Sequence, residues 1–175
     1  MALDDILKQV PIDDIAKQLG VSRDVATTAV EQGGAVLLGG LAKNASTDTG
    51  SAAIQKALKK HEGPGRAASV DDIDQADGDK IVTHILGADD KTAVTEKLTK
   101  SDKTAGIDFG KLLPILAPIV MNLIANATKG KDDSTAKTPG GGGIGDIIGG
   151  LLGGGSSGGG IDLGSIVGGL FGGKK

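Results

Sequence analysis

The chain has no cysteine, tryptophan or tyrosine, and its two aromatic residues are Phe109 and Phe171. Without cysteine it can form no disulfide bond, thiolate metal site or thiol nucleophile, which is typical of a protein of the reducing cytoplasm. Strand-rich folds draw on aromatic and β-branched side chains together. The scarcity of aromatic residues therefore favours a core of aliphatic side chains packed between helices.

The chain also has no excess of basic residues and no long uninterrupted apolar run. Its net charge is −3, whereas a nucleic-acid-binding domain usually carries a basic patch, so the composition argues against nucleic acid as a partner. The longest apolar run, residues 112–123, is interrupted by Pro114, Pro118 and Asn122. It falls short of the roughly 20 apolar residues of a membrane-spanning helix. The first residues are acidic, unlike the basic start of a secretory signal, and we expect a soluble, cytoplasmic protein.

Glycine divides the chain, because more than half of the 31 glycines lie after residue 138. We expect a helical body at residues 1–128, a flexible polar and glycine-containing linker at 129–143, and a glycine-rich, low-complexity tail at 144–175.

Apolar residues recur at helical spacing along the body, which predicts an all-α bundle of about six to seven short helices. Ser22 is a good N-cap for the third helix, and Gly33-Gly34 predicts either a break or a close helix crossing inside it. Pro114 is tolerated in the first turn of the last helix, whereas Pro118 should kink that helix or move its start. The expected helices lie at residues 3–10, 12–19, 22–41, 52–61, 79–86 and 91–98, with a short helical start near 69–72 and a last helix from Phe109.

Three stretches of the body resemble a known family. They are Asp77-Gly-Asp-Lys-Ile81 with His84-Ile-Leu-Gly87, then Leu19-Gly-Val-Ser22, then Leu112-Leu-Pro-Ile-Leu-Ala-Pro-Ile-Val-Met121. On these residues the chain is similar to the YidB-like family of bacterial proteins of unknown function. The resemblance implies an all-helical domain, and it implies no catalytic residue.

Residues 12–30 are similar to a helix-turn-helix. Ala16 is small where two helices would cross, and Gly20 suits the positive-φ position of the turn. Residues 12–32 hold two basic residues against four acidic ones, which opposes binding to phosphates. We therefore favour a packing corner, and keep an atypical DNA-binding regulator as the alternative. In a DNA reader the residues facing the major groove would be Ser22, Arg23, Asp24, Thr27 and Thr28.

We find no motif for catalysis, for a cofactor or for a metal ion. Serine nucleophile elbows and phosphate-binding loops are absent from the sequence. The acidic residues between Asp71 and Asp79 fail the EF-hand pattern, so helix capping and a solvated acidic face are the favoured roles. His61 and His84 lie on different segments, and we favour a partly buried histidine at position 84.

The tail holds two similar units with aliphatic or aromatic residues at i, i+3, i+4, i+7 and i+8, each beside a series of glycines four residues apart. This is the pattern of an amphipathic helix with a ridge of small residues. Each glycine costs a helix up to about 1 kcal/mol relative to alanine, so we expect the units to be helical only when buried against a partner. The residues expected to mediate association are Ile144, Ile147, Ile148, Leu151 and Leu152, then Leu163, Ile166, Val167, Leu170 and Phe171.

These features predict a non-enzymatic helical interaction or self-assembly protein without cofactors. The expected partner is a second copy or another protein, bound through the tail. We rank a membrane surface below a protein partner because the tail units carry Asp146 and Asp162, with Lys174 and Lys175 as the basic residues available for anionic lipid.

Overall fold

The fold was obtained as a computed structural model, which describes residues 8–61, 70–104, 106–128 and 148. Within these ranges the chain forms six α-helices and no strand, so the all-α prediction is confirmed. The expected helix at 3–10 lies mostly outside the described residues. The helices are α2 (Ile12–Leu19), α3 (Arg23–Ala45), α4 (Asp48–Lys60), α5 (Gln75–Leu86), α6 (Ala88–Thr99) and α7 (Phe109–Thr128), with 3-10 turns η1 (Val70–Asp72) and η2 (Asp102–Thr104).

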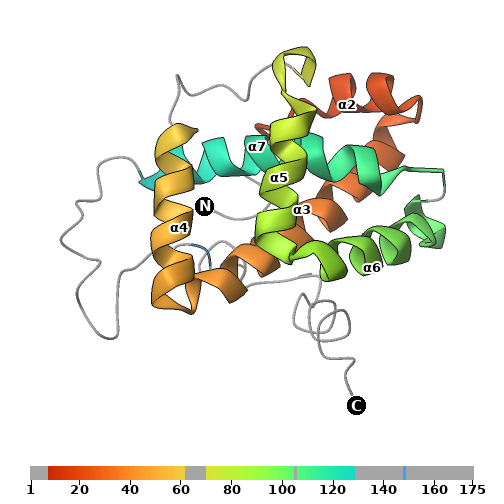
Figure 1. Cartoon of the computed structure of the whole chain (residues 1–175). Helices are drawn as coiled ribbons and strands as arrows, with labels where there is room; N and C mark the ends of the chain where they lie inside the picture. Colours follow the sequence, from red (N-terminus) through yellow and green to blue (C-terminus); the bar gives the residue numbers. More distant parts are fainter. Residues whose placement is uncertain (1–7, 62–69, 105, 129–147, 149–175) are drawn as a thin grey trace, which may run out of the picture.

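Helices α3 and α7 cross in the centre of the molecule, and α5 lies across both of them (Figure 1). Helix α4 also packs on both central helices, while α2 packs on α3 and α6 packs on α5 and α7. The apolar side chains of all these helices form one cluster, whose largest fully buried members come mainly from α3 and α7.

Short polar side chains and glycines set the helix ends. Ser22 accepts a hydrogen bond from the Val25 N–H, and Thr47 accepts one from the Gly50 N–H. Asp74 accepts two, from the N–H groups of Ala76 and Asp77. These bonds satisfy donors that a helix start leaves unpaired, and they place the starts of α4 and α5 several residues before the positions expected from the apolar spacing.

Helix α3 is buried on all sides along its middle part. Every residue from Gly33 to Leu41 is buried, because α7, α5, α4 and α2 all pack against this helix. Its sequence therefore shows no single apolar stripe, which is the pattern expected of a central helix.

The glycines of α3 allow neighbouring helices to approach closely. A Cβ atom on Gly33 would lie 2.9 Å from Cδ1 of Leu116 in α7, and one on Gly40 would lie 2.6 Å from Cγ2 of Ile85 in α5. The helix continues unbroken through Gly33-Gly34. Of the two outcomes expected at these glycines, the close crossing is therefore correct and the break is wrong.

Helix α7 continues through both of its prolines. It starts at Phe109, directly after Asp108, whose carboxylate accepts a hydrogen bond from the Gly110 N–H. Pro114 therefore lies in the second turn rather than in the first, and Pro118 does not move the start of the helix. Packing compensates for the missing N–H groups, because both prolines lie in the most deeply buried helix of the bundle.

Helix α7 is also long and apolar enough to cross a membrane by length and composition. The window Phe109–Asn126 has a mean hydropathy of 1.5, so the interrupted run at 112–123 understated the length of this apolar segment. The structure buries 72% of that window inside the protein, as expected of the core helix of a bundle.

Two of the acidic residues between Asp71 and Asp79 make contacts within the fold. Asp74 caps α5, and the carboxylate of Asp79 pairs with the ammonium group of Lys91, which also donates to the hydroxyl of Thr83. The contacts of Lys91 join α5 to α6. The cap by Asp74 agrees with the capping role that the sequence favours for this segment over a calcium loop.

Candidate functional site

The corner between α2 and α3 has the backbone of a tight helix-turn-helix. Gly20 ends α2 with a φ of 68°, and Ser22 caps α3. Ile15 and Ala16 are buried against α3, as the spacing predicts. Helix α3 is 23 residues long and contributes core residues from Ala26 onward, so this corner is continuous with the centre of the bundle.

The side chains expected to face DNA are engaged within the protein. Nε of Arg23 lies 3.0 Å from a carboxylate oxygen of Asp13. The hydroxyls of Thr27 and Thr28 donate to main-chain carbonyls one turn earlier, at 2.8 and 3.1 Å. The exposed residues beside them include Asp14 and Asp24. The corner therefore presents mixed charge and no basic surface toward a phosphate backbone.

We expect the full chain to bind mixed-sequence duplex DNA only above micromolar concentration at physiological salt, because few cations are available to replace phosphate counterions. Fluorescence anisotropy of a labelled duplex measures this affinity. Nanomolar binding that is lost in Arg23→Ala, yet kept in Lys97→Ala on the exposed face of α6, would contradict the packing interpretation.

Of the ten tail residues expected to mediate association, the structure describes Ile148 alone. Ile148 is fully buried and belongs to the same cluster of apolar side chains as the core of the body. The other nine, like the linker, lie outside the described residues.

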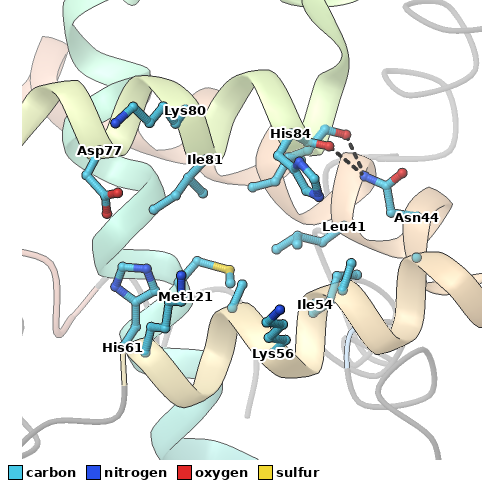
Figure 2. Close-up of a pocket in the computed structure, with 15 residues that line it drawn as sticks. Leu41, Asn44, Ile54, Lys56, His61, Asp77, Lys80, Ile81, His84 and Met121 are labelled. Carbon is cyan, nitrogen blue, oxygen red and sulfur yellow. Dashed lines mark hydrogen bonds between the residues drawn. The ribbon is translucent and has the colours of Figure 1, made fainter.

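A groove lies between α4 and α5. The two helices form its walls and run in opposite directions, while Leu41 of α3 and Met121 of α7 form its floor (Figure 2). The groove encloses about 550 Å³. Ile54 and Ile81 extend the apolar surface along the two walls.

Two asparagine side chains hold the walls in place. Asn44 of α3 donates to the main-chain carbonyl of Ile85 at 2.7 Å, near the end of α5. Asn122 of α7 donates to the carbonyl of His61 at 2.6 Å, just after α4. Both bonds satisfy carbonyls that a helix end leaves without an intrahelical donor, so each wall is fixed to the floor at its C-terminal end.

Both histidines of the chain line this groove, although they are 23 positions apart in the sequence. Figure 2 shows the His84 ring on the α5 side of the groove and the Lys56 side chain on α4 across from it, while His61 lies at the other end, below Asp77. Among the described residues, no group of three or more His, Asp or Glu side chains could hold a metal ion.

The groove is the feature that sequence reasoning missed. On α5 the lining residues are Asp77, Lys80, Ile81, His84 and Ile85, and on α4 they include Ala53, Ile54, Ala57 and Lys60, followed by His61 just after the helix. Each set recurs every three or four positions, so the two faces are detectable in the sequence. Their apposition is not, because it depends on how α3 and α7 orient the two helices.

The fold and these surfaces define a helical-bundle protein with an open groove on one face. Comparison with protein families matches residues 2–127 to a family described as bacterial protein of unknown function (DUF937). The chain belongs to this family, which is the YidB-like family indicated by its sequence. No curated protein and no solved structure matches the chain significantly.

Proposed function

We propose that the protein is a non-enzymatic interaction or self-assembly module in which the tail mediates association with a second copy or another protein. The burial of Ile148 supports this proposal, because a residue of the first tail unit is fully enclosed among apolar side chains of the body. A body that accepts one aliphatic residue of the tail offers the same kind of surface to the tail of another copy.

The second tail unit repeats the spacing of the first at residues 163–171. Two units of one pattern on one chain allow one unit to pack on its own body and the other on a neighbour. An aliphatic stripe that is too short to hold a helix in water becomes helical when it is buried, so association and folding of the second unit are coupled.

The test places a charge among the apolar residues of the second tail unit, at residues 163–171. Val167→Asp in the full chain is expected to abolish concentration-dependent association, measured by sedimentation velocity, because a buried carboxylate without a partner is strongly unfavourable. The melting of the body should be unchanged. Ile148→Asp is expected to lower the free energy of unfolding by about 1–3 kcal/mol in addition, since it removes a buried aliphatic side chain.

The matched control is the double variant Ser156→Asp and Ser157→Asp, which adds charge between the two units and outside both stripes. It should associate as the unmodified chain does. A full chain that stays monomeric at every concentration and retains no protein from lysate through its tail would refute the proposal, as would equal loss of association in the control.

A further inference from the structure

We propose that the groove between α4 and α5 is a binding site for a small anionic amphiphile, an alkyl chain that ends in a carboxylate or a phosphate. This site is separate from the association surface of the tail. Four properties of the groove carry the inference: its size, its apolar floor, the charge of its rim and the way its walls are held.

The size suits a small molecule. Ligand pockets enclose about 300–1,000 Å³ and combine a mostly apolar lining with a few polar groups, and this groove encloses about 550 Å³. The groove is open on one side, so an extended alkyl chain can lie along it without a change in the positions of α4 and α5.

The floor is apolar and adaptable. Leu41 and Met121 are buried at the base, and Ile81 lines the α5 wall. Methionine is flexible and polarisable, and it adjusts to ligands of varying shape. A chain of methylene groups laid over these three residues would be removed from water along most of its length.

The rim is cationic. Lys56, Lys60 and Lys80 line the groove, and Asp77 is the one acidic residue among the described residues that line it. Lys56 on α4 and His84 on α5 lie across the groove from each other at one end (Figure 2), whereas Asp77 lies near its other end. An anionic head therefore fits between Lys56 and His84, with its alkyl chain directed toward Met121. A cationic amphiphile has no comparable site at that end.

The walls are held in place before a ligand binds. The hydrogen bonds from Asn44 and Asn122 fix the C-terminal ends of α5 and α4. The groove therefore needs little reorganisation to accept a ligand, which lowers the entropic cost of binding.

The test uses the full chain with ¹³C-methyl-labelled methionine. Met1 and Met121 are the two methionines of the chain, and Met121→Leu assigns the signal from the floor. Sodium decanoate below its micellar concentration is expected to shift the Met121 signal saturably, and so is decyl phosphate if the site accepts both head groups. Octanoate should bind up to about fifteenfold more weakly, from about fourfold for each buried methylene group. Decyltrimethylammonium should leave the signal unchanged.

Two pairs of variants on α4 separate this site from non-specific binding. Lys56→Ala should weaken decanoate binding about threefold, the scale of one partly exposed ion pair, while Lys59→Ala, which changes an exposed residue outside the lining, should not. Ala53→Leu should fill the groove and abolish binding with no loss of stability. Ala52→Leu, on the exposed face, should bind as the unmodified chain does.

An unmoved Met121 signal at saturating decanoate overturns the proposal, as does equal weakening by Lys59→Ala or equal binding of the cationic amphiphile. If decanoate leaves the Met121 signal unchanged, but the signal differs between the unmodified chain and Val167→Asp, the tail occupies the groove instead. Failure of tail association leaves this test unaffected, because Val167 plays no part in amphiphile binding.

Discussion

Replacing Gly78 with alanine is expected to lower the free energy of unfolding by about 3 kcal/mol, the upper part of the range for overpacked cores. A Cβ atom at this position would lie 1.9 Å from the carbonyl oxygen of Pro114 and 2.7 Å from its carbonyl carbon. Both atoms belong to the main chain of α7, so no side-chain rotation relieves the contact. Helices α5 and α7 must therefore move apart.

The position of this contact follows from Pro118. A helix carbonyl normally accepts a hydrogen bond from the N–H four residues later, and Pro118 has no N–H to offer the carbonyl of Pro114. The hydrogen-bearing Cα of Gly78 lies against that oxygen, in an arrangement that favours a weak Cα–H···O contact. Two of the stretches that mark the family, one around Gly78 and one around Pro114, are thus the two sides of one helix crossing.

The effect is measured by urea unfolding followed through helical circular dichroism, since the chain has no tryptophan for fluorescence. Gly110→Ala in α7 is the matched control. A Cβ atom on Gly110 meets side-chain atoms alone, the closest being Oδ1 of Asp108 at 3.0 Å. This control should change the free energy of unfolding by less than about 1 kcal/mol, because alanine favours a helix while the Asp108 carboxylate, which caps the helix, shifts by a few tenths of an ångström. Equal stability of the two variants would show that α5 and α7 are not packed this closely.

Replacing Phe109 with alanine is expected to lower the free energy of unfolding by about 3–5 kcal/mol. Phe109 is fully buried at the start of α7, and its ring lies near the bare Cα of Gly33 in α3. It is the largest fully buried side chain of the described residues. The structure around such a deletion relaxes only partly, so a cavity adds to the lost burial.

The chain supplies a matched control in its other phenylalanine. Phe171→Ala makes the same chemical change in the second tail unit, and it should leave the unfolding of the body unchanged if the cooperative unit, which includes Ile148, excludes that second unit. A loss of stability in Phe171→Ala comparable to that in Phe109→Ala would place the second tail unit inside the cooperative unit.

Several parts of the candidate surfaces could be predicted from residues close together in the sequence. The turn at Gly20 and the cap at Ser22 depend on local backbone geometry, and the structure contains both. The acidic segment before α5 was correctly assigned to capping because Asp74 acts on N–H groups two and three residues away. Thr47, which caps α4 in the same way, was missed because the apolar spacing of that helix begins later.

The sequence by itself determined the helical class of this protein and the positions of most helices, because helical periodicity, caps and glycine turns act over a few residues. It also determined that α3 would either break or be crossed closely by another helix at Gly33-Gly34. Only the tertiary structure decided that α3 continues through these glycines, since the benefit of close packing against Leu116 depends on where α7 lies.

The tertiary structure also decided that His61 and His84 face one groove and that Gly78 meets Pro114. The two residues of each pair lie on or beside different helices. No local sequence pattern specifies the path of the chain that connects those helices. The two sides of each pair can be detected in the sequence as helix faces, but their meeting depends on the crossing of α3 and α7. That crossing results from packing the aliphatic side chains of the whole body at once.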